Sequence, residues 1–128
     1  MNETHQLGDL QLAIMRVLWA KGEATVAEVH EGLRGERERA LTTIATMLTK
    51  MERKGVVTHR TEQRRFVYRA AVREADVHRG MVKDLVDRVF AGDPTALVHH
   101  LVRHGEIDAA ELDELRELIS KRTPRRSR

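Results

Sequence analysis

Apolar side chains recur every three or four positions through the first part of the chain, which is the spacing of one buried helix face. This spacing predicts three helices, over residues 7–21, 26–34 and 41–54. Thr25 and Glu28 have the spacing of a capping box, in which each side chain bonds the backbone N–H of the other residue. We therefore expect the second helix to begin after Thr25, with a short strand over 23–25 before it.

A hairpin is expected directly after the third helix. Gly55 ends that helix, and two strands are predicted near residues 56–60 and 66–70. The tip between the strands consists of Gln63, Arg64 and Arg65. The order helix, short strand, helix, helix, hairpin is that of a winged helix-turn-helix, so we assign residues 1–71 to a DNA-binding domain of this type.

The second half of the chain predicts three more helices. The first covers about 73–91, and the second ends at Gly105. The third opens on another capping box, formed by Asp108 and Glu111. Three short helices with almost no aromatic residues enclose little core alone. We therefore interpret residues 72–122 as a helical dimerisation domain.

The dimer seam should lie along the apolar stripes of these helices, at Val82, Val86, Val89, Leu97, Leu101, Leu112, Leu115, Leu118 and Ile119. An intramolecular core is the alternative interpretation of the leucine run at 112–119. Residues 123–128 contain no apolar side chain and should form a disordered basic tail. The whole chain is thus expected to be mainly α with a small β-hairpin, as a winged helix-turn-helix followed by a three-helix dimerisation domain.

Charge is distributed unevenly along the chain. The net charge is only +3, but residues 37–69 hold nine Lys/Arg against three Asp/Glu, a local charge of +6. Residues 71–122 hold eight against eleven and are net acidic. A polyanion such as DNA would therefore bind at the third helix and the hairpin.

The third helix and the hairpin supply the candidate DNA contacts. The first turns of a recognition helix meet base edges in the major groove, and a wing contacts the adjacent backbone. The candidates on the helix are Thr42, Thr43, Thr46, Lys50 and Arg53, and those on the hairpin are Arg60, Arg64, Arg65 and Tyr68. The alternative interpretation is a helix surface that is exposed to solvent and has no function. Because threonine is a mediocre helix former, several threonines on one exposed face favour a functional reason.

Several function classes find no support in the sequence. The chain has no cysteine, which excludes disulfides, thiolate zinc sites and iron–sulfur clusters. His100 and His104 have the spacing of a metal pair, but no supporting ligand is evident, so we predict no metal and no cofactor. No catalytic motif or small-molecule substrate site is evident, so we predict a protein that is not an enzyme. Without an apolar run of membrane-spanning length or a signal peptide, we expect a cytoplasmic location.

Five segments of the chain have a distinctive order and spacing, at 7–19, 43–49, 66–68, 90–98 and 111–115. In these segments the chain resembles the penicillinase and methicillin-resistance repressor family of bacterial winged-helix regulators. The order and spacing of the segments together make the match specific. Thr42 and Ala45 stand where basic side chains are common in the family, which implies a different operator sequence.

The resemblance implies a homodimeric repressor that covers a palindromic operator in double-stranded DNA. In well-known members, a membrane-bound sensor protease triggers cleavage of an Asn-Phe bond in the dimerisation domain. That bond aligns with His100 and Leu101, which are therefore the implied cleavage position. The competing hypothesis is a winged-helix adaptor that binds proteins and has no sequence-specific DNA binding.

Overall fold

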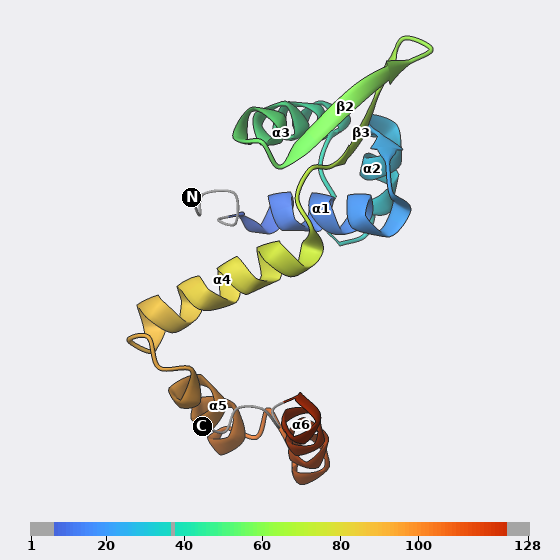
Figure 1. The fold of residues 1–128 in the computed structure, drawn as a ribbon. Helices are drawn as coiled ribbons and strands as arrows, with labels where there is room; N and C mark the ends of the chain where they lie inside the picture. Colours follow the sequence, from blue (N-terminus) through green and yellow to red (C-terminus); the bar gives the residue numbers. More distant parts are fainter. Residues whose placement is uncertain (1–6, 37, 123–128) are drawn as a thin grey trace. The chain divides into compact units, whose positions relative to one another are not determined.

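The computed structural model describes residues 7–36 and 38–122, and within these ranges it has six helices and one three-stranded antiparallel sheet (Figure 1). The chain forms two compact units, one ending at Val82 and one beginning at Lys83. The predicted fold class, mainly α with a small β-hairpin, is confirmed. The boundary after residue 71 stays a prediction, and the tail at 123–128 lies outside the described residues.

The first unit contains three helices: α1 (Asp9–Lys21), α2 (Val26–Gly32) and α3 (Leu41–Lys54). The predicted capping box opens α2, because Thr25 N donates to Glu28 Oε1 over 2.9 Å and Glu28 N donates to Thr25 Oγ1 over 3.2 Å. Gly55 ends α3 in the left-handed conformation, at φ 90°. A residue with a side chain would be strained there.

The small sheet contains β1 (Ala24–Thr25), β2 (Val57–Glu62) and β3 (Arg65–Ala70), in the order β1-β3-β2. In the hairpin, Val57 pairs with Ala70 and Glu62 pairs with Arg65. The strands therefore run closer to the tip than predicted. The connecting loop has only two residues, 63–64, and Arg65 belongs to β3.

The core of the first unit joins its helices to the sheet. Its largest fully buried side chains are Ile14, Met15, Leu18, Val29, Ile44, Leu48, Met51, Val56, Val57 and Val77. Trp19 closes one edge, because its indole Nε1 donates to the backbone oxygen of Val72 over 3.0 Å. This bond ties α1 to the segment that leaves the sheet.

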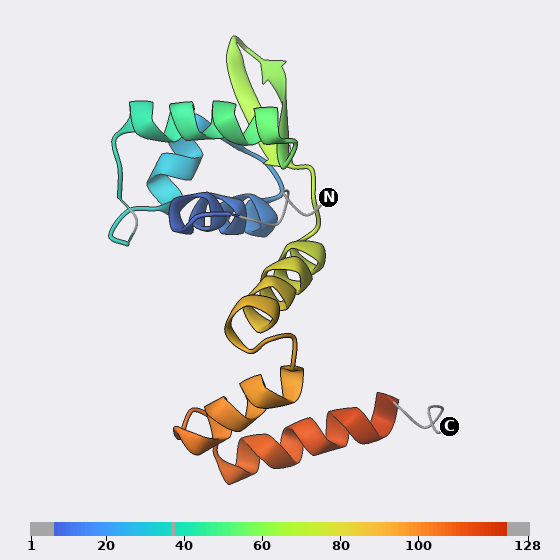
Figure 2. The same cartoon turned by 90° about the vertical axis from the view of Figure 1, so that its left-hand side faces the viewer.

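The remaining helices are α4 (Glu74–Val89), α5 (Pro94–Arg103) and α6 (Ala109–Arg122). The second predicted capping box opens α6, with Asp108 N donating to Glu111 Oε1 over 2.9 Å and Glu111 N donating to Asp108 Oδ1 over 2.8 Å. The helices α5 and α6 follow each other as a helical hairpin in the second unit (Figure 2). Neither contains a buried residue. Across 7–36 and 38–122, no helix is both long and apolar enough to span a bilayer.

Candidate nucleic-acid interface

The two faces of α3 have different roles. Ile44, Leu48 and Met51 are fully buried and hold the helix against the rest of the first unit. The opposite face is exposed and carries the predicted contact residues Thr42, Thr43, Thr46, Lys50 and Arg53. The structure therefore brings these five side chains together on one accessible helix surface. Their contact with DNA stays a prediction.

The C-terminal end of α3 extends this basic surface beyond the predicted residues. Lys50, Arg53 and Lys54 line a shallow cavity together with Gln11 of α1. Lys54 Nζ donates to Gln11 Oε1 over 3.3 Å, which ties the end of the helix to α1. Sequence analysis missed Lys54, although its position next to Arg53 in the last turn was a usable signal.

The hairpin tip is a tight turn whose two central residues are not glycine. Gln63 has φ 50° and Arg64 has φ 67°, so both central residues of the two-residue loop are left-handed. A type I′ turn has this conformation, and it normally uses Asn and Gly. Arginine at such a position is conformationally unfavourable, which favours a functional reason for the side chain. Arg64 and Arg65 are both exposed at this end of the hairpin.

Two substitutions of Arg64 distinguish the strain of its left-handed backbone from the effect of its charge. Both Arg64→Gly and Arg64→Ala remove the guanidinium, but only glycine relieves the left-handed strain. We expect the glycine variant to be more stable than the alanine variant by about 1 kcal/mol, measured as the free energy of unfolding in urea. Equal stabilities would contradict a left-handed residue 64 in solution.

Arg60 differs from the tip arginines because two carboxylates already hold it. Its Nη2 lies 2.8 Å from Glu23 Oε2, and its Nη1 lies 2.7 Å from Glu62 Oε1. The hydrogen bond to Glu23, followed by the one to Glu62, raises the pKa of Arg60 above its usual value. The bond to Arg60 likewise lowers the pKa of Glu23. Since its charge is countered inside the unit, Arg60 is a weaker candidate for a phosphate contact.

Tyr68 is a weaker candidate than predicted. Its side chain is only 3 % exposed and belongs to the core, which leaves little of it accessible to a phosphate, and its contact with DNA stays a prediction. Burial, followed by the nearby charge of Glu52, raises the pKa of Tyr68, and a hydrogen bond with Thr49 opposes the rise. The alternation of side chains along β3 places Tyr68 inward, and only the strand register makes this visible.

Sequence analysis also missed a pair that links α3 to the hairpin. His59 Nδ1 of β2 lies 2.7 Å from Glu52 Oε1 and 2.9 Å from Glu52 Oε2. The His59 ring stacks on Phe66 of β3, with centroids 3.9 Å apart and planes at 17°. The available signal was that His59 lies two residues after the buried Val57 and therefore shares its face of β2.

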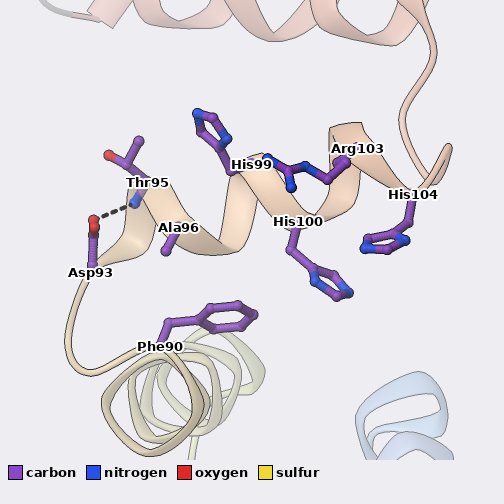
Figure 3. Close-up of a pocket in the computed structure, with 8 residues that line it drawn as sticks. All are labelled: Phe90, Asp93, Thr95, Ala96, His99, His100, Arg103 and His104. Carbon is purple, nitrogen blue, oxygen red and sulfur yellow. Dashed lines mark hydrogen bonds between the residues drawn. The ribbon is translucent and has the colours of Figure 1, made fainter.

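A second surface hollow lies in the other unit, beside α5 (Figure 3). The rings of His100 and His104 point to the side where Phe90 lies, and their centroids are 4.5 Å apart. His99 points to the other side of the helix in the same view. Among the described residues, no group of three or more His, Cys, Asp or Glu could hold a metal ion.

The second unit exposes four of the residues predicted for the dimer seam, Val89, Leu115, Leu118 and Ile119, whereas the predicted Val86 is buried in the single chain. Its helices leave large apolar side chains uncovered at Leu85, Val89, Val98, Val102, Leu115, Leu118 and Ile119. Leu118 is 61 % exposed and Ile119 is 62 % exposed. A groove on this surface is lined by Val98 of α5 and by the apolar side of α6. Contiguous exposed apolar surface of this kind marks an interaction site.

Comparisons with known proteins show which family the chain is similar to. The family model described as penicillinase repressor matches residues 7–121. The chain is 24% identical to the methicillin resistance regulatory protein MecI of Staphylococcus aureus strain N315, covering 94% of this chain and 98% of that protein. It is 32% identical to the transcriptional regulator BlaI of Mycobacterium tuberculosis, over 94% of this chain and 88% of the relative.

A solved structure of a DNA-binding domain also matches the chain. The solution structure of the DNA binding domain of the repressor BlaI superposes with a TM-score of 0.51 at 33% identity. The match covers 59% of this chain and 93% of that domain.

Proposed function

The chain belongs to the penicillinase repressor family of transcriptional regulators, which are not enzymes, and we propose that it is a homodimeric repressor of transcription. In this proposal it acts in the cytoplasm, where the dimer occupies a palindromic operator in double-stranded DNA. The observation that carries the proposal is the exposed threonine and basic face of α3, next to a hairpin that presents two arginines at its tip.

The chemistry of α3 suits the major groove. Hydroxyl groups of Thr42, Thr43 and Thr46 can bond to base edges or phosphates, and threonine methyl groups can contact the methyl group of thymine. Lys50 and Arg53 supply positive charge further along the same face. With about six phosphates neutralised per dimer, log affinity should fall with log salt at a slope of about −5.

The uncovered apolar surface of α5 and α6 supports a dimer. A single half-site module buries on the order of 600–1,000 Å² on DNA, too little for tight specific binding. Two copies joined through the second unit would place two recognition helices about one helical turn apart. The symmetric operator follows from the two-fold symmetry of such a pair.

Relief of repression is proposed to involve cleavage in α5, at His100–Leu101, by a membrane-bound sensor protease. A helix must open locally before a protease can bind its backbone. In the single chain α5 has no buried side chain to resist such opening.

The proposal is tested by selecting random duplex DNA on the purified full-length protein. We expect enrichment of a palindrome whose half-sites lie about one helical turn apart, with the slope of affinity against salt given above. Recovery of unrelated sequences only, or no retention at low salt, would contradict it and favour the protein-binding adaptor. Cleavage is tested separately, by mapping the fragment ends after co-expression with the candidate protease.

A further inference from the structure

The pair formed by Glu52 and His59 joins the two elements that the proposed function places on DNA. Glu52 belongs to α3, whose exposed face carries the candidate base contacts. His59 belongs to β2, and its Nδ1 lies within hydrogen-bond distance of both carboxylate oxygens of Glu52. The hydrogen bond between these two side chains therefore connects α3, the proposed recognition helix, to the β2–β3 hairpin, the wing.

The surroundings of His59 distinguish this pair from the ion pairs on the surface. The side chains of His59 and Glu52 are 26 % and 34 % exposed, whereas the Arg116–Asp113 pair of α6 is 78 % and 75 % exposed. The His59 ring is covered on one side by Phe66, which holds its plane. It also contacts Tyr68, at a centroid distance of 5.5 Å. A fixed, half-buried hydrogen bond resists bending better than a mobile surface pair does.

The hairpin needs such a restraint. A two-stranded ribbon that extends from its sheet is only marginally stable in water. Residues 59 and 60 point to opposite faces of β2. On one face His59 reaches Glu52, and on the other Arg60 reaches Glu23. The wing is thus held from both faces, and the contact of His59, together with the hydrogen bond between Tyr68 and Thr49, fixes its position relative to α3.

We propose that His59 is a positioning residue for DNA binding. Its hydrogen bond to Glu52 and its stacking on Phe66 fix the tip arginines relative to α3. The backbone contact of the wing and the groove contact of the helix can then form together. The inference rests on the proposed function, because it describes how the same site is assembled.

The test is a mutant cycle on the selected operator. His59→Ala is compared with the wing variant Arg64→Ala/Arg65→Ala and with the triple variant. His59→Ala should cost each protomer one phosphate contact. The affinity of the dimer for the operator should then fall about 30-fold near 0.15 M salt, and the slope of log affinity against log salt should become shallower by about 1.8. In the wing variant, adding His59→Ala should change affinity less than about twofold, because the contact it positions is already gone. Additive effects would overturn the proposal.

Two further variants separate positioning from general damage. Glu52→Ala should reproduce the effect of His59→Ala and add nothing to it. His78→Ala is the matched control, because His78 also pairs with a glutamate and packs on an aromatic ring, Trp19, away from the wing. The control should leave the salt slope unchanged.

A measurement without DNA keeps the inference separate from the proposed function. Residual dipolar couplings of the hairpin amides report the orientation of the wing relative to α3. His59→Ala should change these couplings and leave those of α1 and α2 unchanged. Unchanged wing couplings would overturn the positioning role even if the protein binds DNA. If the parent protein binds no DNA, the proposed function fails, and the inferred role in DNA binding fails with it.

Discussion

Replacing Lys50 and Arg53 together with glutamine is expected to weaken operator binding about a thousandfold near 0.15 M salt. Each variant dimer would lose four phosphate contacts, since both residues lie on the exposed face of α3 in each protomer. At about 0.9 per contact, the slope of log affinity against log salt should become shallower by about 3.6. Fluorescence anisotropy of labelled operator at several salt concentrations measures both quantities.

The control changes the net charge by the same amount elsewhere. Lys83→Gln/Arg88→Gln also removes two cations per protomer, both on α4. There they pair with Asp87 and Asp84 at 2.9 and 3.0 Å. This variant should keep most of the affinity. If the two double variants weakened binding equally, the effect would come from overall charge, and the assignment of α3 as the recognition helix would lose its support.

Introducing a charge into the exposed apolar side of α6 is expected to separate the dimer. Leu118 is 61 % exposed in the single chain, so Leu118→Asp should leave the fold of one protomer intact. In a dimer the carboxylate would be buried without a partner, at a cost of several kcal/mol. The dimer dissociation constant should rise at least about a thousandfold, since each 1.4 kcal/mol is a factor of ten. Sedimentation velocity measures the change directly.

Ser120→Asp is the matched variant for this experiment. It places the same carboxylate two residues along the same helix, at a position that is polar in the parent chain. We expect it to remain dimeric and to bind operator as the parent does. A parent protein that sediments as a monomer, or a dimeric Leu118→Asp variant, would show that this face of α6 is not the seam.

The elements that the sequence predicted well are those fixed by local physics. The two capping boxes, at Thr25 and Asp108, form as expected because their bonds span only three residues. The bounds of α3 match the predicted 41–54, since an apolar period and a following glycine define both its face and its end. The exposed face of α3 follows from the same period, so the threonine and basic surface was predictable.

The features that were not predicted depend on contacts between residues that are far apart in the sequence. Whether Tyr68 faces the core or the solvent is decided by its register opposite Ala24 and His59. No local pattern shows that register. The partner of His59 lies on a different element, and Glu23, one of the two partners of Arg60, precedes β1. Strand order and packing create these pairs, so the sequence alone indicated the charges without showing which of them were already neutralised.

The single tryptophan of the chain makes the two units separately observable. Trp19 is held in the first unit by its bond to Val72, and the one tyrosine, Tyr68, lies in the same unit. The second unit therefore has no strong ultraviolet fluorophore, while α5, α6 and the C-terminal part of α4 contribute to its dichroism. Melting followed by tryptophan emission would report the first unit alone, and the helical signal would report both. The gap between the two curves would measure, without any label, how strongly the halves of the protein depend on each other.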